Sequence, residues 1–128
     1  MNTNEFDAVG KHIICDMFKV NRSTLEQINS DSYDIFDIFI KNTLVDAKIN
    51  LLSKTVHHFD GCNGAFTALY LLAESHLSIH TWPEHGYIAL DVFTCGKSDT
   101  QYVVDMLIKY FEPESIQTQN ISRGIQQN

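Results

Sequence analysis

The sequence predicts an α+β fold: a two-layer sandwich in which a mostly antiparallel sheet carries helices on one face. Two observations support this fold class. The hydrophobic period changes along the chain between two residues and three to four residues, and four strand-like runs follow one another between residues 51 and 94. Short connections join these runs, and short connections favour antiparallel pairing. The second face of the sheet then needs a cover, which solvent or a second subunit could supply.

The first third of the chain predicts one strand and two helices. Residues 12–18 alternate in hydrophobicity and predict a strand whose more apolar side carries Ile13, Cys15 and Met17. Ser23, with Glu26 three residues later, has the capping-box pattern that opens a short helix. A longer helix is expected to begin near Asp31 or Ser32. Its apolar stripe consists of Ile35, Phe36, Phe39, Ile40, Leu44, Ala47 and, at its end, Leu51.

The rest of the chain predicts five strands and a third helix. Four of the strands are expected at 53–59, 65–73, 76–82 and 87–94. The turns between them contain glycines, which accept positive φ without strain. Ser98 or Asp99 is expected to cap a helix over 99–111 that Pro113 ends. Its inward side is expected to carry Val103, Met106, Leu107 and Tyr110. A last strand near 115–122 would complete the sheet.

Composition limits the classes of partner. The 128 residues are 44% hydrophobic and fit one domain over 1–128. A formal net charge of −7 argues against nucleic acid or an anionic membrane as the main partner, although a cationic small ligand would be tolerated. The longest apolar stretch, 64–73, is too short to span a bilayer. The first ten residues lack the features of a signal peptide, so a cytoplasmic location is expected.

The three cysteines are expected to be free thiols. Cys15, Cys62 and Cys95 are an odd number and contain no Cys-x-x-Cys pair. A disulfide framework or a thiolate zinc site is therefore not expected.

The segment AESHLSIHTWPEHGY, residues 73–87, is rich in groups that transfer protons. A zinc site is not expected, because His76 and His80 would lie roughly 13 Å apart on a strand. A serine hydrolase using Ser75, His80 or His76, and Asp91 is disfavoured, because no G-x-S-x-G elbow is present. Polar residues that merely alternate with core residues would explain each histidine alone but not the whole run.

Two long motifs carry a family resemblance. AESHLSIHTWPE followed by GYIALDVFTCG resembles the short prokaryotic form of S-adenosylmethionine decarboxylase, a pyruvoyl-dependent enzyme of polyamine synthesis that is made as a proenzyme. GKHIICD near the start and HHFDGCNGAFT also fit the family pattern, as does the order of helices and strands. The resemblance covers most of the chain.

The resemblance implies self-processing. The hydroxyl of Ser75 would attack the carbonyl of Glu74, and the chain would be cut between these two residues. Residue 75 would become a pyruvoyl group, so no external cofactor is needed. Thr67 matches the position that assists the acyl shift, and His80 matches the base that removes the α-proton of residue 75.

The resemblance also assigns the residues that act on the substrate, S-adenosylmethionine. The pyruvoyl carbonyl condenses with the substrate amine and draws electrons as carbon dioxide leaves. Cys95 matches the proton donor, and Glu84 matches the residue that binds the ribose hydroxyls. Phe59 matches the aromatic residue that contacts the adenine, and its π-face also suits the sulfonium. The stretch NGAFTAL departs from the family pattern, with Ala68 after the threonine and one more residue in the turn, which weakens the alignment of Phe59.

Spacing bears on the oligomeric state. Ser75 and His80 are five residues apart, so on one straight strand they point to opposite faces. Either the chain bends after Ser75, or two subunits share each site. In the second case, which we favour, one subunit supplies Ser75 and Cys95 and the other supplies Thr67, His80, Glu84 and Phe59. The short members of the family that the chain resembles work as homodimers with interfacial sites.

Two other functions stay open from the sequence. Relatives on the same scaffold decarboxylate simpler amino acids, such as ornithine or arginine, with similar pyruvoyl chemistry. A homologue that stays uncleaved and only binds a partner is the third hypothesis. No metal is expected in any of the three.

Overall fold

The computed structural model describes residues 9–126, so most of the N-terminal segment considered for a signal peptide lies outside the described residues. The elements in chain order are β1 (Gly10–Phe18), α2 (Arg22–Glu26), α3 (Tyr33–Asp46), β2 (Leu51–His58), β3 (Phe66–Leu72), β4 (Ser75–Trp82), the 3₁₀ helix η1 (Pro83–His85), β5 (Tyr87–Cys95), α4 (Thr100–Phe111) and β6 (Ser115–Arg123).

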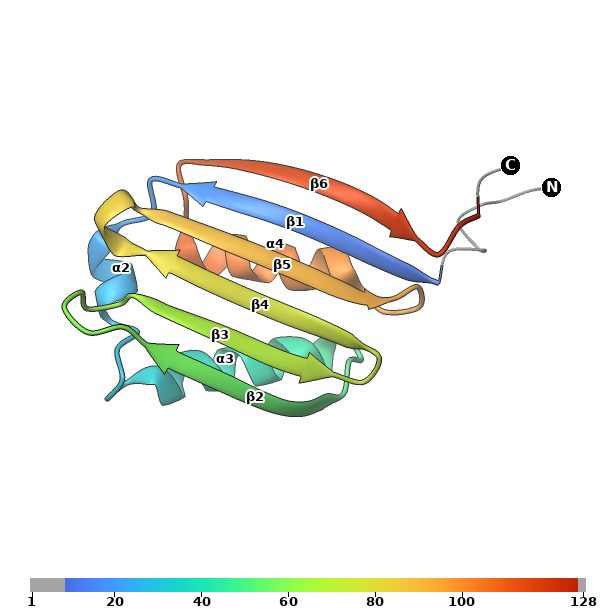
Figure 1. The fold of residues 1–128 in the computed structure, drawn as a ribbon, viewed down its shortest axis with the longest axis horizontal. Coiled ribbons are helices and arrows are strands. Elements are labelled where there is room, and N and C mark those ends of the chain that lie inside the picture. The colour runs from blue at the N-terminus through green and yellow to red at the C-terminus, as the bar shows by residue number, and fades with distance from the viewer. Residues whose placement is uncertain (1–8, 127–128) are drawn as a thin grey trace.

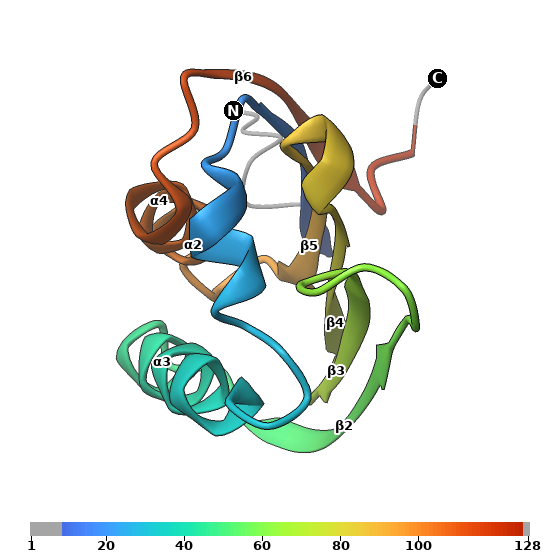
Figure 2. The ribbon, with the colours of Figure 1, turned by 90° about the vertical axis from the view of Figure 1, so that its left-hand side faces the viewer.

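The six strands form one sheet in the order β2-β3-β4-β5-β1-β6, and all neighbours pair antiparallel. The helices α3 and α4 lie behind this sheet, and the turned view shows both on the same side of it (Figure 1, Figure 2). The α+β sandwich predicted from the sequence is therefore confirmed. β1 lies between β5 and β6, so the first strand of the chain is internal and β2 and β6 form the edges.

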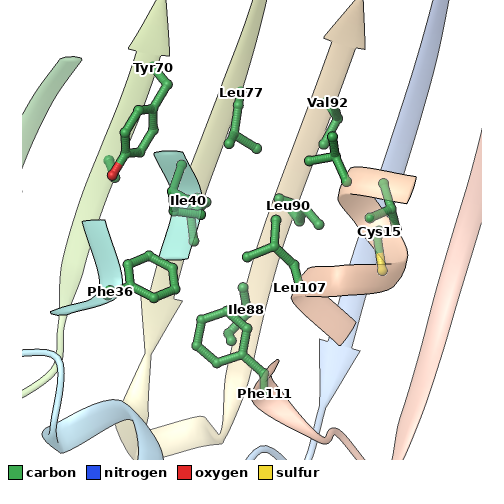
Figure 3. Close-up of a cluster of buried hydrophobic side chains, with 14 of the residues drawn as sticks. Cys15, Phe36, Ile40, Tyr70, Leu77, Ile88, Leu90, Val92, Leu107 and Phe111 are labelled. Carbon is green, nitrogen blue, oxygen red and sulfur yellow. The ribbon is translucent and has the colours of Figure 1, made fainter. Parts of the chain in front are cut away.

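The hydrophobic core lies between the sheet and the helices. Alternation along β1 buries Ile13, Cys15 and Met17, as the sequence predicts. Other strands and the helices add Phe36, Ile40, Tyr70, Leu77, Ile88, Leu90, Val92, Leu107 and Phe111, which gather in Figure 3. Because alternate residues of each strand face this core, the side chains between them face the other way.

Two details of the first helices differ from the prediction. Asn21, not Ser23, caps α2, because its Oδ1 accepts a hydrogen bond from the Ser23 backbone N–H at 2.9 Å. On α3 the side chain of Ile35 is 70% exposed, while Phe36, one helical position further round, is buried. Leu51 lies beyond α3 and begins β2.

The cap and stop of α4 agree with the sequence, but its buried side differs. The Asp99 carboxylate accepts a hydrogen bond from the Tyr102 backbone N–H at 3.0 Å. Val103 and Leu107 are buried as expected, whereas Met106 and Tyr110 are only half-buried. Val104 and Phe111 complete the buried side. Among residues 9–126, no helix is both long and apolar enough to cross a membrane.

The face of the sheet opposite the helices, here called the open face, is not covered by any described segment of the chain (Figure 2). It carries the even-numbered residues of β1 and β4 and the odd-numbered residues of β3, β5 and β6. Four of its large apolar side chains are between 37% and 53% exposed: Leu69, Leu71, Trp82 and Ile121. Exposed apolar side chains on an uncovered sheet face are a feature of interaction surfaces.

Candidate active site

Three of the predicted site residues gather at one end of the sheet, here called the hairpin group: Glu74, Ser75 and Cys95. Ala73 and Glu74 form the two-residue connection between β3 and β4, and Ser75 is the first residue of β4. Cys95 ends β5, the next strand in the sheet. This is the right-hand end of the sheet in Figure 1.

The backbone of Glu74 is strained. Its φ is +64°, in the left-handed region where a side chain costs roughly 1–2 kcal/mol. The same region is occupied by Lys19, Lys48 and Glu112. The carbonyl of Glu74 is the one that the resemblance expects Ser75 to attack. In the uncut chain the Ser75 hydroxyl donates to the Ala73 carbonyl oxygen at 3.3 Å.

The thiol of Cys95 is tuned by its neighbours. Its sulfur lies 3.4 Å from the Ser98 hydroxyl oxygen. This hydrogen bond, helped by the backbone N–H groups of Lys97 and Ser98, holds the pKa of Cys95 below its ordinary value of 9.0, although burial and the Glu74 carboxylate act in the opposite direction. A thiol of this kind gives up its proton more readily than an ordinary cysteine.

The other predicted residues, here called the imidazole group, lie at the opposite end: Phe59, Thr67, His80 and Glu84. Thr67 and His80 are cross-strand partners on β3 and β4. The hydroxyl oxygen of Thr67 lies 3.1 Å from His80 Nδ1. This contact fixes the orientation of the imidazole ring. His80 Nε2 has no hydrogen-bond partner among the described residues and is available as a base.

Glu84 and Phe59 lie on the connections at this end of the sheet. Glu84 is in η1, and its Oε1 accepts a weak hydrogen bond from the Cys62 thiol at 3.7 Å. Phe59 is 50% exposed and packs edge-on against His57, with ring centroids 4.7 Å apart. A cleft of about 430 Å³ is lined by residues 58–65, including Phe59 and Cys62, and by Asn29 and Ser30.

The two groups do not meet within one chain. Along β4, Ser75 and His80 are separated by five residues, or about 17 Å. The pairing of β4 with both neighbours continues without a register shift, so the bend considered as one alternative is absent. Ser75 pairs with Leu72, a core residue, so its side chain is directed to the helix side, whereas His80 is on the open face. Because Cα is tetrahedral, the α-hydrogen of residue 75 then lies on the side away from the helices.

A polar chain on the open face was not predicted from the sequence. His12 Nε2 is hydrogen-bonded to an Asp91 carboxylate oxygen, and His12 Nδ1 lies 3.3 Å from Nη1 of Arg123. Asp91 is 79 positions and Arg123 is 111 positions from His12 in the sequence, so no local pattern could link them. Within residues 9–126, no three His, Cys, Asp or Glu side chains form a group that could hold a metal ion.

Comparisons with known proteins agree with the resemblance. The family model described as S-adenosylmethionine decarboxylase matches residues 11–124. The S-adenosylmethionine decarboxylase proenzyme of a Sulfurihydrogenibium species is 36% identical over 118 residues, which cover 91% of this chain and 84% of that protein.

Solved structures show the same fold. The crystal structure of the adenosylmethionine decarboxylase from Aquifex aeolicus matches with a TM-score of 0.77 at 29% identity, over 94% of this chain and 95% of that one. The Trypanosoma brucei AdoMetDC-delta26 monomer matches with a TM-score of 0.64 at 13% identity, over 84% of this chain but 44% of that one, so there the fold fills less than half of the chain. The chain belongs to the S-adenosylmethionine decarboxylase family.

Proposed function

We propose that the chain is a self-processing, pyruvoyl-dependent decarboxylase that converts S-adenosylmethionine to decarboxylated S-adenosylmethionine for polyamine synthesis. Family membership supports the substrate and the reaction. The observation that carries the proposal is the position of the Glu74–Ser75 bond. This bond lies at the tip of a hairpin, with Glu74 in a left-handed backbone conformation and Cys95 at the same end of the sheet.

Maturation would begin with an acyl shift. The Ser75 oxygen attacks the Glu74 carbonyl carbon, the C–N bond breaks as the C–O bond forms, and the hydroxyl proton passes to the freed amine. The Thr67 hydroxyl can donate to the developing oxyanion. His80 then removes the α-proton of residue 75, and the ester oxygen leaves as a carboxylate on Glu74. Hydrolysis of the resulting dehydroalanine releases ammonia and leaves the pyruvoyl group.

The residues present fit this prosthetic group. Position 75 begins a strand directly after a two-residue connection, so a cut there frees both new ends without breaking a ladder pair inside the sheet. When formed, the pyruvoyl group supplies a ketone that binds the substrate amine and accepts electrons as carbon dioxide leaves. The Cys95 thiol, with its lowered pKa, returns a proton to the substrate carbon. Glu84 binds the ribose hydroxyls, and Phe59 contacts the adenine and the sulfonium.

We further propose that residues 1–128 act as one domain and that two copies form a homodimer with shared sites. A two-fold axis that runs across the strands, in the plane between two open faces, places the hairpin group of one chain over the imidazole group of its partner. His80 of the partner then approaches residue 75 from the open face, the side on which the α-hydrogen lies. Two symmetric sites result, and the exposed apolar residues of the open face are covered.

Mass spectrometry tests the maturation step. Purified protein incubated at neutral pH should yield two fragments that meet at Glu74 and Ser75, while Ser75→Ala should remain one chain. Carbon dioxide release from carboxyl-labelled S-adenosylmethionine should accompany cleavage. A wild-type chain that stays intact would refute the enzymatic function and leave the uncleaved binding homologue as the better hypothesis.

Mixing two inactive variants tests the shared site. Neither Ser75→Ala nor His80→Ala should be cleaved alone. In a mixed dimer, Ser75 of the His80→Ala chain faces an intact imidazole on its partner, so that chain should be cut. If the mixture stays uncut after subunit exchange, each site is built from one chain.

A further inference from the structure

Arg123 is the one lysine or arginine of the described strands whose side chain is on the open face. Among the described strands, the lysines and arginines are Lys11, Lys54 and Arg123. Lys11 pairs with the buried Thr94, and Lys54 binds the Asp37 carboxylate of α3, so both are directed to the helix side. Arg123 pairs with Gly10, an even-numbered residue of β1, so its side chain is on the open face. There it contacts the ring of Phe93. A carboxylate that enters between two open faces therefore meets one fixed positive charge from this sheet.

Arg123 lies in the same row of the sheet as Cys95. Gly10 pairs with Cys95 on one side and with Arg123 on the other. With strands about 4.8 Å apart, the Cα atoms of Arg123 and Cys95 are roughly 10 Å apart. Gly10 places no side chain between them. A Cβ at Gly10 would come within 2.6 Å of the Phe93 ring, which lies over this position.

The guanidinium of Arg123 is oriented by its neighbours. A guanidinium can only donate, so His12 Nδ1 accepts from Nη1 at 3.3 Å. His12 Nε2 is then the ring nitrogen that donates to the Asp91 carboxylate. The guanidinium carbon also lies 5.3 Å from the centroid of the Phe93 ring. His12 uses one of five N–H donors, and no described carboxylate lies within 4 Å of Arg123.

We infer that Arg123 binds the α-carboxylate of the substrate. This inference rests on the proposed function, because Cys95 would protonate the same carbon that carries the carboxylate. A planar guanidinium with free N–H donors matches a carboxylate in a bidentate geometry. Arg123 lies two strands away from Cys95 in the same row, and Gly10, the residue between them, carries no side chain. The residue holds the carboxylate in place and distinguishes the substrate from its decarboxylated product.

Arg123→Met tests this role with two ligands that differ in the carboxylate. The kcat/KM for S-adenosylmethionine should fall roughly 10- to 100-fold, mainly through KM, as expected for loss of hydrogen bonds to a charged group. Inhibition by decarboxylated S-adenosylmethionine, which lacks the carboxylate, should change less than about twofold. Cleavage between Glu74 and Ser75 should proceed at the wild-type rate in the intact mass spectrum.

Two further variants serve as controls. Arg22→Met makes the same change of charge on α2, where Arg22 is paired with Glu26. It should leave unchanged both the kcat/KM for S-adenosylmethionine and the inhibition by decarboxylated S-adenosylmethionine. Arg123→Lys keeps the charge but loses the planar fork, so it should retain more substrate affinity than Arg123→Met. If Arg123→Met does not fold, the affinities of Arg123→Lys for substrate and product still test the role.

The outcomes are distinct. Equal weakening of substrate and product, or no change in either, would overturn the role in carboxylate binding while leaving the decarboxylase intact. A loss of cleavage in Arg123→Met would assign the residue to maturation instead. If the wild-type protein neither cleaves nor releases carbon dioxide, the proposed function fails, and the inference fails with it.

Discussion

The hydroxyl oxygen of Ser98 lies 3.4 Å from the sulfur of Cys95, at the turn that joins β5 to α4. This hydrogen bond is the main cause of the lowered pKa of Cys95. We therefore expect Ser98→Ala to raise the Cys95 pKa, because the thiolate loses a donor. The pH dependence of iodoacetamide alkylation, followed peptide by peptide, should shift to higher pH at Cys95.

The same experiment contains its own control. Burial, with a smaller effect of Asp16, raises the pKa of Cys15 to about 11, so its peptide should stay unlabelled at neutral pH in both proteins. An unchanged Cys95 profile in Ser98→Ala would show that the backbone N–H groups alone tune the thiol.

Thr67→Val should slow self-cleavage without preventing folding. The substitution keeps the shape of the residue but removes the hydroxyl that contacts His80 Nδ1 at 3.1 Å. Loss of one donor to a developing oxyanion typically costs about 100-fold or more in rate. The half-time of cleavage, followed by intact mass, measures the effect. Thr67→Ser retains the hydroxyl and should cleave within a few fold of the wild-type rate; comparable slowing in both variants would contradict the assignment.

Asp37→Asn should destabilise the fold and change its acid sensitivity. The buried Asp37 carboxylate accepts hydrogen bonds from Tyr70 at 2.9 Å and from Lys41 at 3.1 Å, and it also binds Lys54. Burial alone would raise the Asp37 pKa, but these partners hold it below its ordinary value of 3.8. We expect a loss of about 1–3 kcal/mol in the free energy of unfolding at neutral pH.

The pH dependence of this loss has a definite sign. A carboxyl whose folded pKa is lowered stabilises the fold above the unfolded pKa, and that stabilisation disappears as the pH falls through the folded value. Urea unfolding of Asp37→Asn and wild type, in the uncleaved Ser75→Ala background, should therefore converge below about pH 3.8. A constant difference from pH 7 to pH 3 would contradict the electrostatic explanation.

Gly64→Ala and Gly61→Ala form a matched pair in one loop. Both glycines have positive φ, +86° and +87°, which costs an alanine roughly 1–2 kcal/mol. A Cβ at Gly64 would also lie 2.4 Å from the Leu25 carbonyl oxygen, whereas a Cβ at Gly61 meets nothing within 4 Å. Overpacking adds about 1–3 kcal/mol at Gly64 alone. Equal unfolding free energies for the two variants would show that the loop moves away from Leu25.

The single tryptophan reports on the dimer. Trp82 is 39% exposed on the open face and stacks against Tyr87, with ring centroids 5.2 Å apart. If two open faces pack together, its surroundings become less polar. The emission maximum should then move to longer wavelength as the protein is diluted through the dissociation of the dimer, in parallel with the mass measured by ultracentrifugation. A dimer that dissociates without any spectral change would use another surface.

Most elements of the fold were predictable because their periodicity is local. β1, β4 and β5 alternate clearly, and the limits of α4 follow the Asp99 cap and Pro113. The predictions that were wrong concern positions where two nearby residues of similar chemistry could fill the same role. Asn21 and Ser23 are both good caps, and Ile35 is as apolar as its neighbours but lies on the outer side of α3. Packing against the sheet decides between such neighbours, and packing is not a local property.

The identities of the predicted site residues follow from three continuous motifs, and the polar chain around Arg123 follows from none. Residues 74–84 are close in sequence, so their chemistry could be identified together. Arg123, His12 and Asp91 come from three strands far apart in the chain. Their meeting depends on β1 lying between β5 and β6, which periodicity does not specify.

The sequence by itself determined the family pattern and the candidate chemistry, because a serine, a histidine and a cysteine occur at specific positions in long motifs. Only the tertiary structure decided how these groups are distributed. The unbroken pleat of β4 holds Ser75 and His80 about 17 Å apart and on opposite sides. The strand register brings Thr67 to His80, and Arg123 into the row of Cys95. Register is set by pairing across the whole sheet, and no single stretch of sequence contains that information.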